Sequence, residues 1–302
     1  MKQLVILSGK GGTGKTSVTA ALAQLASSGE HPLRTVLADA DVDAANLELL
    51  LAPVIQEKHT FIGGKTAIID PQLCGQCGTC KSVCRFDAVI ETDEGFHIDP
   101  IACEGCGACV YQCPAETIRM EPEVAGQWFK SGSKFGPLFH AALTPAQENS
   151  GKLVSLVKEQ AKQHAIKDGA DLTLVDGPPG IGCAVISAIS GADLALIVSE
   201  PTAAGVHDMK RVLDIAKQFS VPVFVCINKA DIYLEGADSI EAFCQQNGIE
   251  VIGRIPFDPA VTEAMVQGQT VINYNADAPA SAALIGIWQE ILKKINNHSK
   301  ES

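Results

Sequence analysis

Residues 9–16 read G-K-G-G-T-G-K-T, and this stretch decides the fold because it satisfies the phosphate-binding pattern G-x-x-x-x-G-K-[ST]. A short apolar run at residues 4–7 precedes the loop, and residues 17–26 read as a helix. Strand, loop and helix therefore occur in the order that the motif requires. The sequence predicts an α/β fold with a mostly parallel sheet flanked by helices.

The mechanics of this loop assign roles to its residues. Backbone N–H groups of a glycine-rich loop and of the following helix N-terminus donate to phosphate oxygens. Lys15 is expected to reach the β- and γ-phosphates of ATP, and the hydroxyl of Thr16 to bind Mg²⁺. The loop residues predicted to bind ATP and Mg²⁺ are Gly11, Gly12, Thr13, Gly14, Lys15, Thr16 and Ser17.

Eight of the eleven cysteines form two copies of the spacing C-x2-C-x2-C-x3-C between residues 74 and 113. An Ile-Asp-Pro triplet leads into each copy, at residues 69–71 and 98–100, so the repeat extends beyond the cysteines. This spacing resembles that of two-cluster ferredoxins, in which the fourth cysteine of each copy binds the other cluster. The resemblance assigns one [4Fe-4S] cluster to Cys74, Cys77, Cys80 and Cys113, and the second to Cys84, Cys103, Cys106 and Cys109.

Zinc sites and disulfides are the alternatives for these cysteines, and both fit the spacing less well. Tandem zinc sites need pairs of C-x2-C hooks separated by a loop, whereas here a third cysteine follows after two residues. Arg85 departs from the ferredoxin pattern, because it stands where proline usually follows the fourth cysteine. A nearby cation favours the reduced cluster, so Arg85 affects the expected potential and leaves the ligands unchanged.

Lys10 adds a second lysine inside the phosphate-binding loop. With it the chain resembles the deviant P-loop ATPases of the MinD, Mrp and nitrogenase iron-protein group. The resemblance implies that Lys10 contacts the nucleotide of a partner subunit, in a homodimer or in a heterodimer with a related ATPase. There it would neutralise phosphate charge as an arginine finger does. The alternative is an ion pair between Lys10 and an exposed carboxylate.

Three further segments follow the order of the same family. Asp39 and Asp41 follow the apolar residues 35–38 and resemble the first switch, where Asp41 would activate water and Asp39 would support the Mg²⁺ shell. Asp176 ends the apolar residues 172–175 and resembles the Walker B carboxylate, with Gly180 expected near the γ-phosphate. Two later strand ends resemble base-binding loops and supply Asn228 and Pro256.

Composition and periodicity give the domain plan and the location. Residues 1–53 and 125–302 are predicted to form the ATPase domain, and residues 54–124 to form an inserted ferredoxin domain. A net charge of −12 argues against nucleic acid as a partner. The N-terminus lacks the pattern of a signal peptide, and no 18-residue apolar run is present, so the expected location is cytoplasmic and membrane binding is disfavoured.

Several segments carry more modest expectations. Residues 128–140 show no clear period and are predicted to form a connector. Cys183, Cys226 and Cys244 are predicted to be buried packing residues. The alternative for Cys183 comes from the resemblance, because the nitrogenase iron protein has a ligand of its bridging cluster at a similar offset after the aspartate that corresponds to Asp176. An apolar stripe on the last helix is expected to pack against the sheet rather than to bind membrane, and comprises Leu284, Ile287, Trp288, Ile291, Leu292 and Ile295.

Three classes of function follow from the resemblance. The chain is expected to be an ATPase that couples dimer switching to electron transfer or redox sensing. It is otherwise an iron-sulfur or metallocofactor carrier similar to Mrp, or a positioning ATPase similar to MinD. Mrp-like carriers use a C-terminal C-x-x-C that is absent here, which favours electron transfer. The expected partner is a redox protein or a small metallocofactor carrier similar to the orange proteins.

Overall fold

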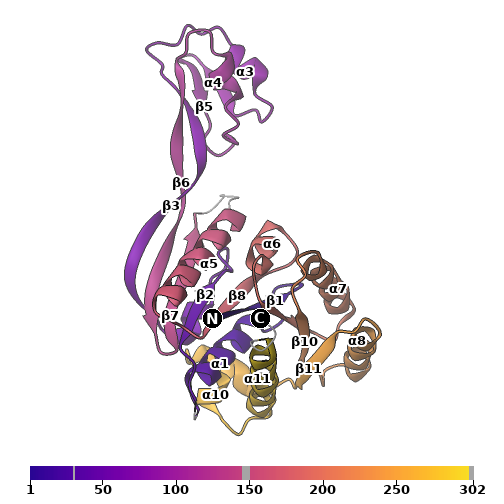
Figure 1. Ribbon diagram of the computed structural model, residues 1–302. Coiled ribbons are helices and arrows are strands. Elements are labelled where there is room, and N and C mark those ends of the chain that lie inside the picture. The colour runs from indigo at the N-terminus through magenta and orange to yellow at the C-terminus, as the bar shows by residue number, and fades with distance from the viewer. Residues whose placement is uncertain (30, 145–149, 299–302) are drawn as a thin grey trace. The chain divides into compact units, whose positions relative to one another are not determined.

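The computed structural model describes residues 1–29, 31–144 and 150–298 of the chain (Figure 1). It divides into two compact units. The first contains Met1–His59, Trp128–Ala142 and the chain from Ser150 onward, and the second contains Thr60–Gln127 with the short segment that begins at Leu143. The strands β3 (Val54–Ile69) and β6 (Ile118–Ser133) carry residues of both units.

A nine-stranded sheet has the order β11-β10-β9-β1-β8-β2-β7-β6-β3. The pairs of β1 with β8 and β9, of β2 with β7 and β8, and of β10 with β9 and β11 are all parallel. The remaining strand bounds are β1 (Lys2–Ser8), β2 (Thr35–Asp39), β7 (Gly136–Leu143), β8 (Leu172–Pro179), β9 (Leu194–Ser199), β10 (Val223–Asn228) and β11 (Glu250–Ile255). The mostly parallel α/β sheet predicted from the phosphate-binding loop is confirmed.

Helices cover both faces of this parallel region (Figure 1). Along β1 the side chains alternate, so that Leu4 and Ile6 join a core with α1 and α11 while Val5 and Leu7 are buried on the opposite face. The helices that flank the sheet are α1 (Lys15–Ser27), α2 (Leu47–Leu51), α5 (Ser150–Lys167), α6 (Cys183–Ile189), α7 (Ala203–Gln218), α8 (Leu234–Gln246), α9 (Pro259–Val266), α10 (Val271–Tyr274) and α11 (Pro279–His298).

The last helix, α11, confirms the prediction made from its apolar stripe. Leu284, Ile287, Trp288 and Ile291 are buried in the core that contains α1, and Leu292 and Ile295 pack against that core. Within the described parts of the chain, none of the helices is both long and apolar enough to cross a bilayer.

The second unit repeats one small motif twice. Short helices α3 (Thr79–Val83) and α4 (Ala108–Gln112) each begin after a left-handed glycine, Gly78 or Gly107, both at φ 74°. The hairpin of β4 (Val89–Thr92) and β5 (Gly95–Ile98) lies between them in the sequence. The buried core of this unit is small and includes two cysteines: it comprises Ala67, Ile69, Cys80, Val89, Cys109 and Ile118.

The segment predicted to form a connector, residues 128–140, is extended in the structure. These residues form the end of β6 and most of β7, joined by a two-residue turn at residues 134–135. Their sequence lacks alternation because the side chains change from partly exposed on β6 to buried on β7, where Leu138 and Phe139 pair with β2. Hydrogen bonding to neighbouring strands, which periodicity does not report, makes this segment extended.

Candidate nucleotide site and cysteine sites

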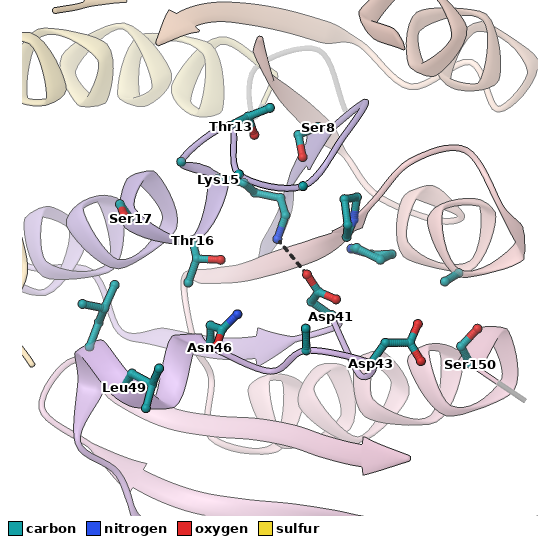
Figure 2. A pocket seen from close by; sticks show the side chains of 18 of the residues that line it. Ser8, Thr13, Lys15, Thr16, Ser17, Asp41, Asp43, Asn46, Leu49 and Ser150 are labelled. Carbon is teal, nitrogen blue, oxygen red and sulfur yellow. Dashed lines mark ion pairs between the residues drawn. The ribbon is translucent and has the colours of Figure 1, made fainter. Parts of the chain in front are cut away.

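A cavity of about 800 Å³ opens at the carboxyl ends of β1, β2 and β8 (Figure 2). Ligands of parallel α/β sheets bind at this edge, because the loops that follow the strands converge there. Residues of the phosphate-binding loop, the segment after β2 and the start of α6 line the cavity. They include Gly11, Gly12, Thr13, Gly14, Lys15, Thr16, Ser17, Asp41, Asp43, Asn46, Pro178, Pro179, Gly182 and Cys183.

Left-handed glycines shape the phosphate-binding loop between β1 and α1. Gly12 has φ 78° and Gly14 has φ 87°, a region that L side chains rarely adopt. A Cβ atom on Gly14 would also lie 2.3 Å from Nδ2 of Asn228. That amide donates a hydrogen bond of 2.7 Å to the carbonyl of Thr13. The end of β10 therefore supports the loop directly.

Asp176 on β8 accepts hydrogen bonds from three side chains of α1. The Lys15 ammonium and the Thr19 hydroxyl each lie 2.9 Å from Oδ1, and the Thr16 hydroxyl lies 2.8 Å from Oδ2. Burial lowers the pKa of Lys15, but the charges of Asp176, Asp41 and Asp39 raise it overall. The ammonium is therefore held charged beside the loop, which is the state that binds phosphate.

Two carboxylates, one at the end of β2 and one just after it, occupy different environments. Asp39 is fully buried and accepts backbone hydrogen bonds of 3.1 Å from Asp41 and Leu47. Burial, together with the charge of Asp176, raises the pKa of Asp39 well above its usual value. Asp41 lines the cavity 3.8 Å from the Lys15 ammonium, as Figure 2 shows, and burial also raises its pKa. Asp41 thus lines the cavity, whereas Asp39 is buried. The hydrogen bonds of Asp39 connect the segment after β2 to the start of α2.

Lys10 contacts a carboxylate that the sequence motif did not identify. Its ammonium lies 2.9 Å from Glu200, which follows β9, and the ammonium of Lys229 lies 2.5 Å from the same carboxylate. Lys229 also donates to the carbonyl of Gly12, at 3.3 Å. The ion pair of Lys10 expected as an alternative is therefore present, with a mostly buried acid as its partner.

Sequence reasoning missed Thr19, Glu200 and Lys229 as site residues. Thr19 could have been predicted from the sequence, because it stands four residues after Lys15 on α1 and so lies on the same helical face. Glu200 and Lys229 carried no such signal, since they come from the ends of two other strands and meet the loop only through the sheet order.

The remaining predicted residues lie around this edge. Gly180 has φ 92°, and its N–H donates a hydrogen bond of 2.9 Å to the carbonyl of Ser8. This hydrogen bond joins the segment after β8 to the start of the loop. Asn228 is the last residue of β10 and Pro256 directly follows β11. The Ala230 N–H donates to the carbonyl of Ile255, which links the two strand ends. Neither Asn228 nor Pro256 belongs to the lining of the described cavity, and their contact with an adenine base stays a prediction.

The eight repeated cysteines gather into two sets within the second unit. Cys74, Cys77, Cys80 and Cys113 line one cavity. Cys84, Cys103, Cys106 and Cys109 line another. Among the described residues, no three His, Cys, Asp or Glu side chains converge as closely as one metal ion requires. Each set supplies four thiols, which is the donor set that a [4Fe-4S] cluster takes.

The three other cysteines have two different environments. Cys226 and Cys244 are buried, which confirms the prediction for them. The same prediction for Cys183 is wrong, because Cys183 is exposed and lines the nucleotide cavity. It is the first residue of α6, and the turn at residues 180–182 directs this helix start toward the cavity edge rather than into the core.

Together these features define a P-loop nucleotide-binding protein. The sequence model of the CobQ/CobB/MinD/ParA nucleotide binding domain matches residues 4–271. An uncharacterized protein of Methanocaldococcus jannaschii is 37% identical over 227 residues, which are 75% of this chain and 78% of the relative. The chain belongs to the CobQ/CobB/MinD/ParA family and is a P-loop ATPase of this class.

More distant similarities agree with this family. An iron-sulfur cluster carrier protein of Pyrococcus furiosus is 25% identical over 159 residues, 48% of this chain and 53% of the relative. The septum site-determining protein MinD of Pyrococcus horikoshii, solved with Mg-ADP, has a TM-score of 0.56 at 17% identity. That comparison covers 96% of this chain and 95% of the other. At that identity the likeness to MinD shows the shared fold.

Proposed function

We propose that this protein is a Mg²⁺-dependent ATPase that couples nucleotide-driven dimer switching to electron transfer or redox sensing through two [4Fe-4S] clusters. The observation that carries the proposal is the sorting of the cysteines. Each of the two cavities in the second unit is lined by three cysteines of one copy and the fourth cysteine of the other. This crossed arrangement is the ligand pattern of two-cluster ferredoxins.

The two cavities have matching surroundings. Cys80 and Cys109 are buried in the core of the unit, while Cys77 and Cys106 are exposed. Gly78 and Gly107 adopt left-handed conformations at the start of α3 and α4. The chain therefore turns sharply between the cysteines of each copy, so that their thiols line the same cavity. When bound, [4Fe-4S] clusters supply one-electron redox chemistry.

The ATPase half supplies the residues for phosphoryl transfer. In the proposed mechanism the Lys15 ammonium, now paired with Asp176, would bind the phosphates of ATP. Thr16 and Asp176 would hold Mg²⁺, which would neutralise phosphate charge. Asp41 faces the same cavity and orients the attacking water. Lys10 acts on the nucleotide of a partner subunit, so ATP favours the dimer and hydrolysis releases it. The other loop residues, Gly11 to Ser17, and Gly180 surround the phosphates.

An anaerobic EPR redox titration of the iron-loaded protein, with and without Mg-ATP, tests this coupling. We expect Mg-ATP to shift the potential of at least one cluster, or to make it reducible by a weaker donor. Lys15→Ala is the matched control, because it removes the phosphate contact and leaves the cysteines intact. Clusters that ignore Mg-ATP in the wild-type protein during turnover would refute the coupling. ATP hydrolysis at the normal rate by Lys15→Ala would refute the site assignment.

The second candidate is a carrier that delivers an iron-sulfur cluster or metallocofactor, and the similarity to the Pyrococcus carrier favours it. A carrier must release its cargo, so iron should pass from the loaded protein to an apo-ferredoxin in an ATP-dependent way. Retention of all iron through many turnovers would favour electron transfer. A MinD-like positioning role predicts instead that a partner protein binds in an ATP-dependent way, regardless of cluster redox state.

A further inference from the structure

We propose that Glu200 is a positioning residue that restrains Lys10 within its own subunit, so that Lys10 becomes available to a partner's nucleotide only when it leaves this carboxylate. The inference rests on the proposed role of Lys10 at a dimer interface. It assigns to Glu200 the control of the protein concentration at which the ATP-dependent dimer forms.

The contacts around Glu200 place both lysines on one carboxylate. Lys10 lies 2.9 Å from Oε2 and Lys229 lies 2.5 Å from Oε1. The Glu200 side chain is 11% exposed, whereas each lysine side chain is 33% exposed. The acid is therefore the fixed partner of the pair, and the lysines are the residues that have access to solvent and to a second subunit.

Close contacts surround the backbone of Glu200. Its carbonyl accepts a hydrogen bond of 2.8 Å from Thr202, the N-cap of α7, and packs so closely on Gly205 that a Cβ there would lie 2.4 Å away. On the other side, a Cβ on Gly9 would lie 2.3 Å from the Cβ of Asp208 on α7. The start of the phosphate-binding loop and the segment that carries Glu200 are thus held at one separation.

Lys229 keeps Glu200 paired when Lys10 moves away from it. A mostly buried carboxylate that loses its sole cation is strongly destabilised. Here Lys229 remains on Glu200 and is anchored to the carbonyl of Gly12, so Glu200 keeps a counter-charge after Lys10 departs. The lysine with two partners is the permanent one, and Lys10 is the exchangeable one.

The test measures ATP turnover of the full-length, iron-loaded protein against protein concentration in Mg-ATP. Neutralising the carboxylate in Glu200→Gln removes its ion pairs with both Lys10 and Lys229. Because Lys10 is then released, half-maximal turnover should occur at roughly threefold to tenfold lower protein concentration. The shift should disappear when Glu200→Gln is combined with Lys10→Gln. Glu200→Asp keeps the charge on a shorter side chain and serves as the conservative variant, so its midpoint should fall between those of the wild-type protein and Glu200→Gln.

The outcomes distinguish the restraint by Glu200 from the role of Lys10 in a partner subunit. An unchanged midpoint in Glu200→Gln, or the same change in the presence and absence of Lys10, overturns the restraint by Glu200. If circular dichroism shows that Glu200→Gln does not fold, Glu200→Asp decides the test. Its shorter side chain lies further from Lys10, so half-maximal turnover should shift to a lower protein concentration by a smaller factor. No shift in Glu200→Asp would overturn the restraint. Normal concentration dependence in Lys10→Gln alone overturns the role of Lys10 in a partner subunit, whatever Glu200 does.

Discussion

A single residue at the nucleotide site can support the phosphate-binding loop in addition to its predicted contact with the ligand. Asn228 illustrates this double use, because its amide donates to the carbonyl of Thr13 and occupies the space beside Gly14. The motif requires a glycine at position 14 for two physical reasons, the left-handed backbone and the nearness of this amide. The second reason comes from a strand more than two hundred residues away in the sequence.

Gly14→Ala should therefore lower the free energy of unfolding by about 2 kcal/mol or more, since it combines a strained backbone with a steric conflict. Denaturant unfolding without nucleotide measures the change. Gly11→Ala is the matched control, because a Cβ at Gly11 meets nothing within 4 Å and its φ lies outside the left-handed region. Equal stability losses in the two variants would contradict the argument.

At the scale of elements, α6 depends on a lysine from another helix. Lys158 of α5 donates to the carbonyls of Ser187, Ala188 and Ser190, at distances of 2.9, 2.5 and 2.8 Å. These are the carbonyls at the end of α6, where the helix dipole favours a cation. Burial lowers the pKa of Lys158 to about 8, so the ammonium is still mostly charged at neutral pH. The lysine therefore fixes the C-terminus of the helix whose first residue lines the nucleotide cavity.

Replacing this lysine in Lys158→Met should lower the free energy of unfolding by roughly 3 kcal/mol, because three carbonyls lose a charged donor. Chemical denaturation at pH 7 provides the measurement. Lys162→Met removes an exposed lysine one turn later on α5 and should change stability by less than about 0.5 kcal/mol. A Lys158→Met protein as stable as Lys162→Met would show that water replaces the ammonium at the end of α6.

Elements near a motif were more predictable than elements held by distant contacts. The order from β1 to α2 followed from the phosphate-binding loop and from the apolar run before Asp39, and the structure has the same order. The strands at residues 128–140 could not be read, because hydrogen bonds to β2 and β3 stabilise them rather than their own periodicity. Likewise the predicted burial of Cys183 relied on residue type alone, and its exposure comes from where α6 begins.

The whole molecule contains two units whose buried cores differ in size. The first unit has a large apolar core on both faces of a parallel sheet. The second unit buries only a few side chains within its described residues, two of which are the predicted iron ligands Cys80 and Cys109. Small units with such cores usually depend on metals or disulfides for stability. If the proposed clusters are present, their binding energy is largely the folding energy of the second unit.

Removal of iron with a chelator should therefore raise amide hydrogen exchange across Thr60–Gln127 by a hundredfold or more and leave β1 and β8 protected. Two buried cysteines give a matched comparison. Cys80→Ser should reduce the iron content and expose the second unit to exchange. Cys226→Ser, in the core of the first unit, should keep the iron and affect only its own unit. Unchanged exchange in Thr60–Gln127 after complete iron loss would mean that its small apolar core folds without metal, and the clusters would then have no part in the folding of this unit.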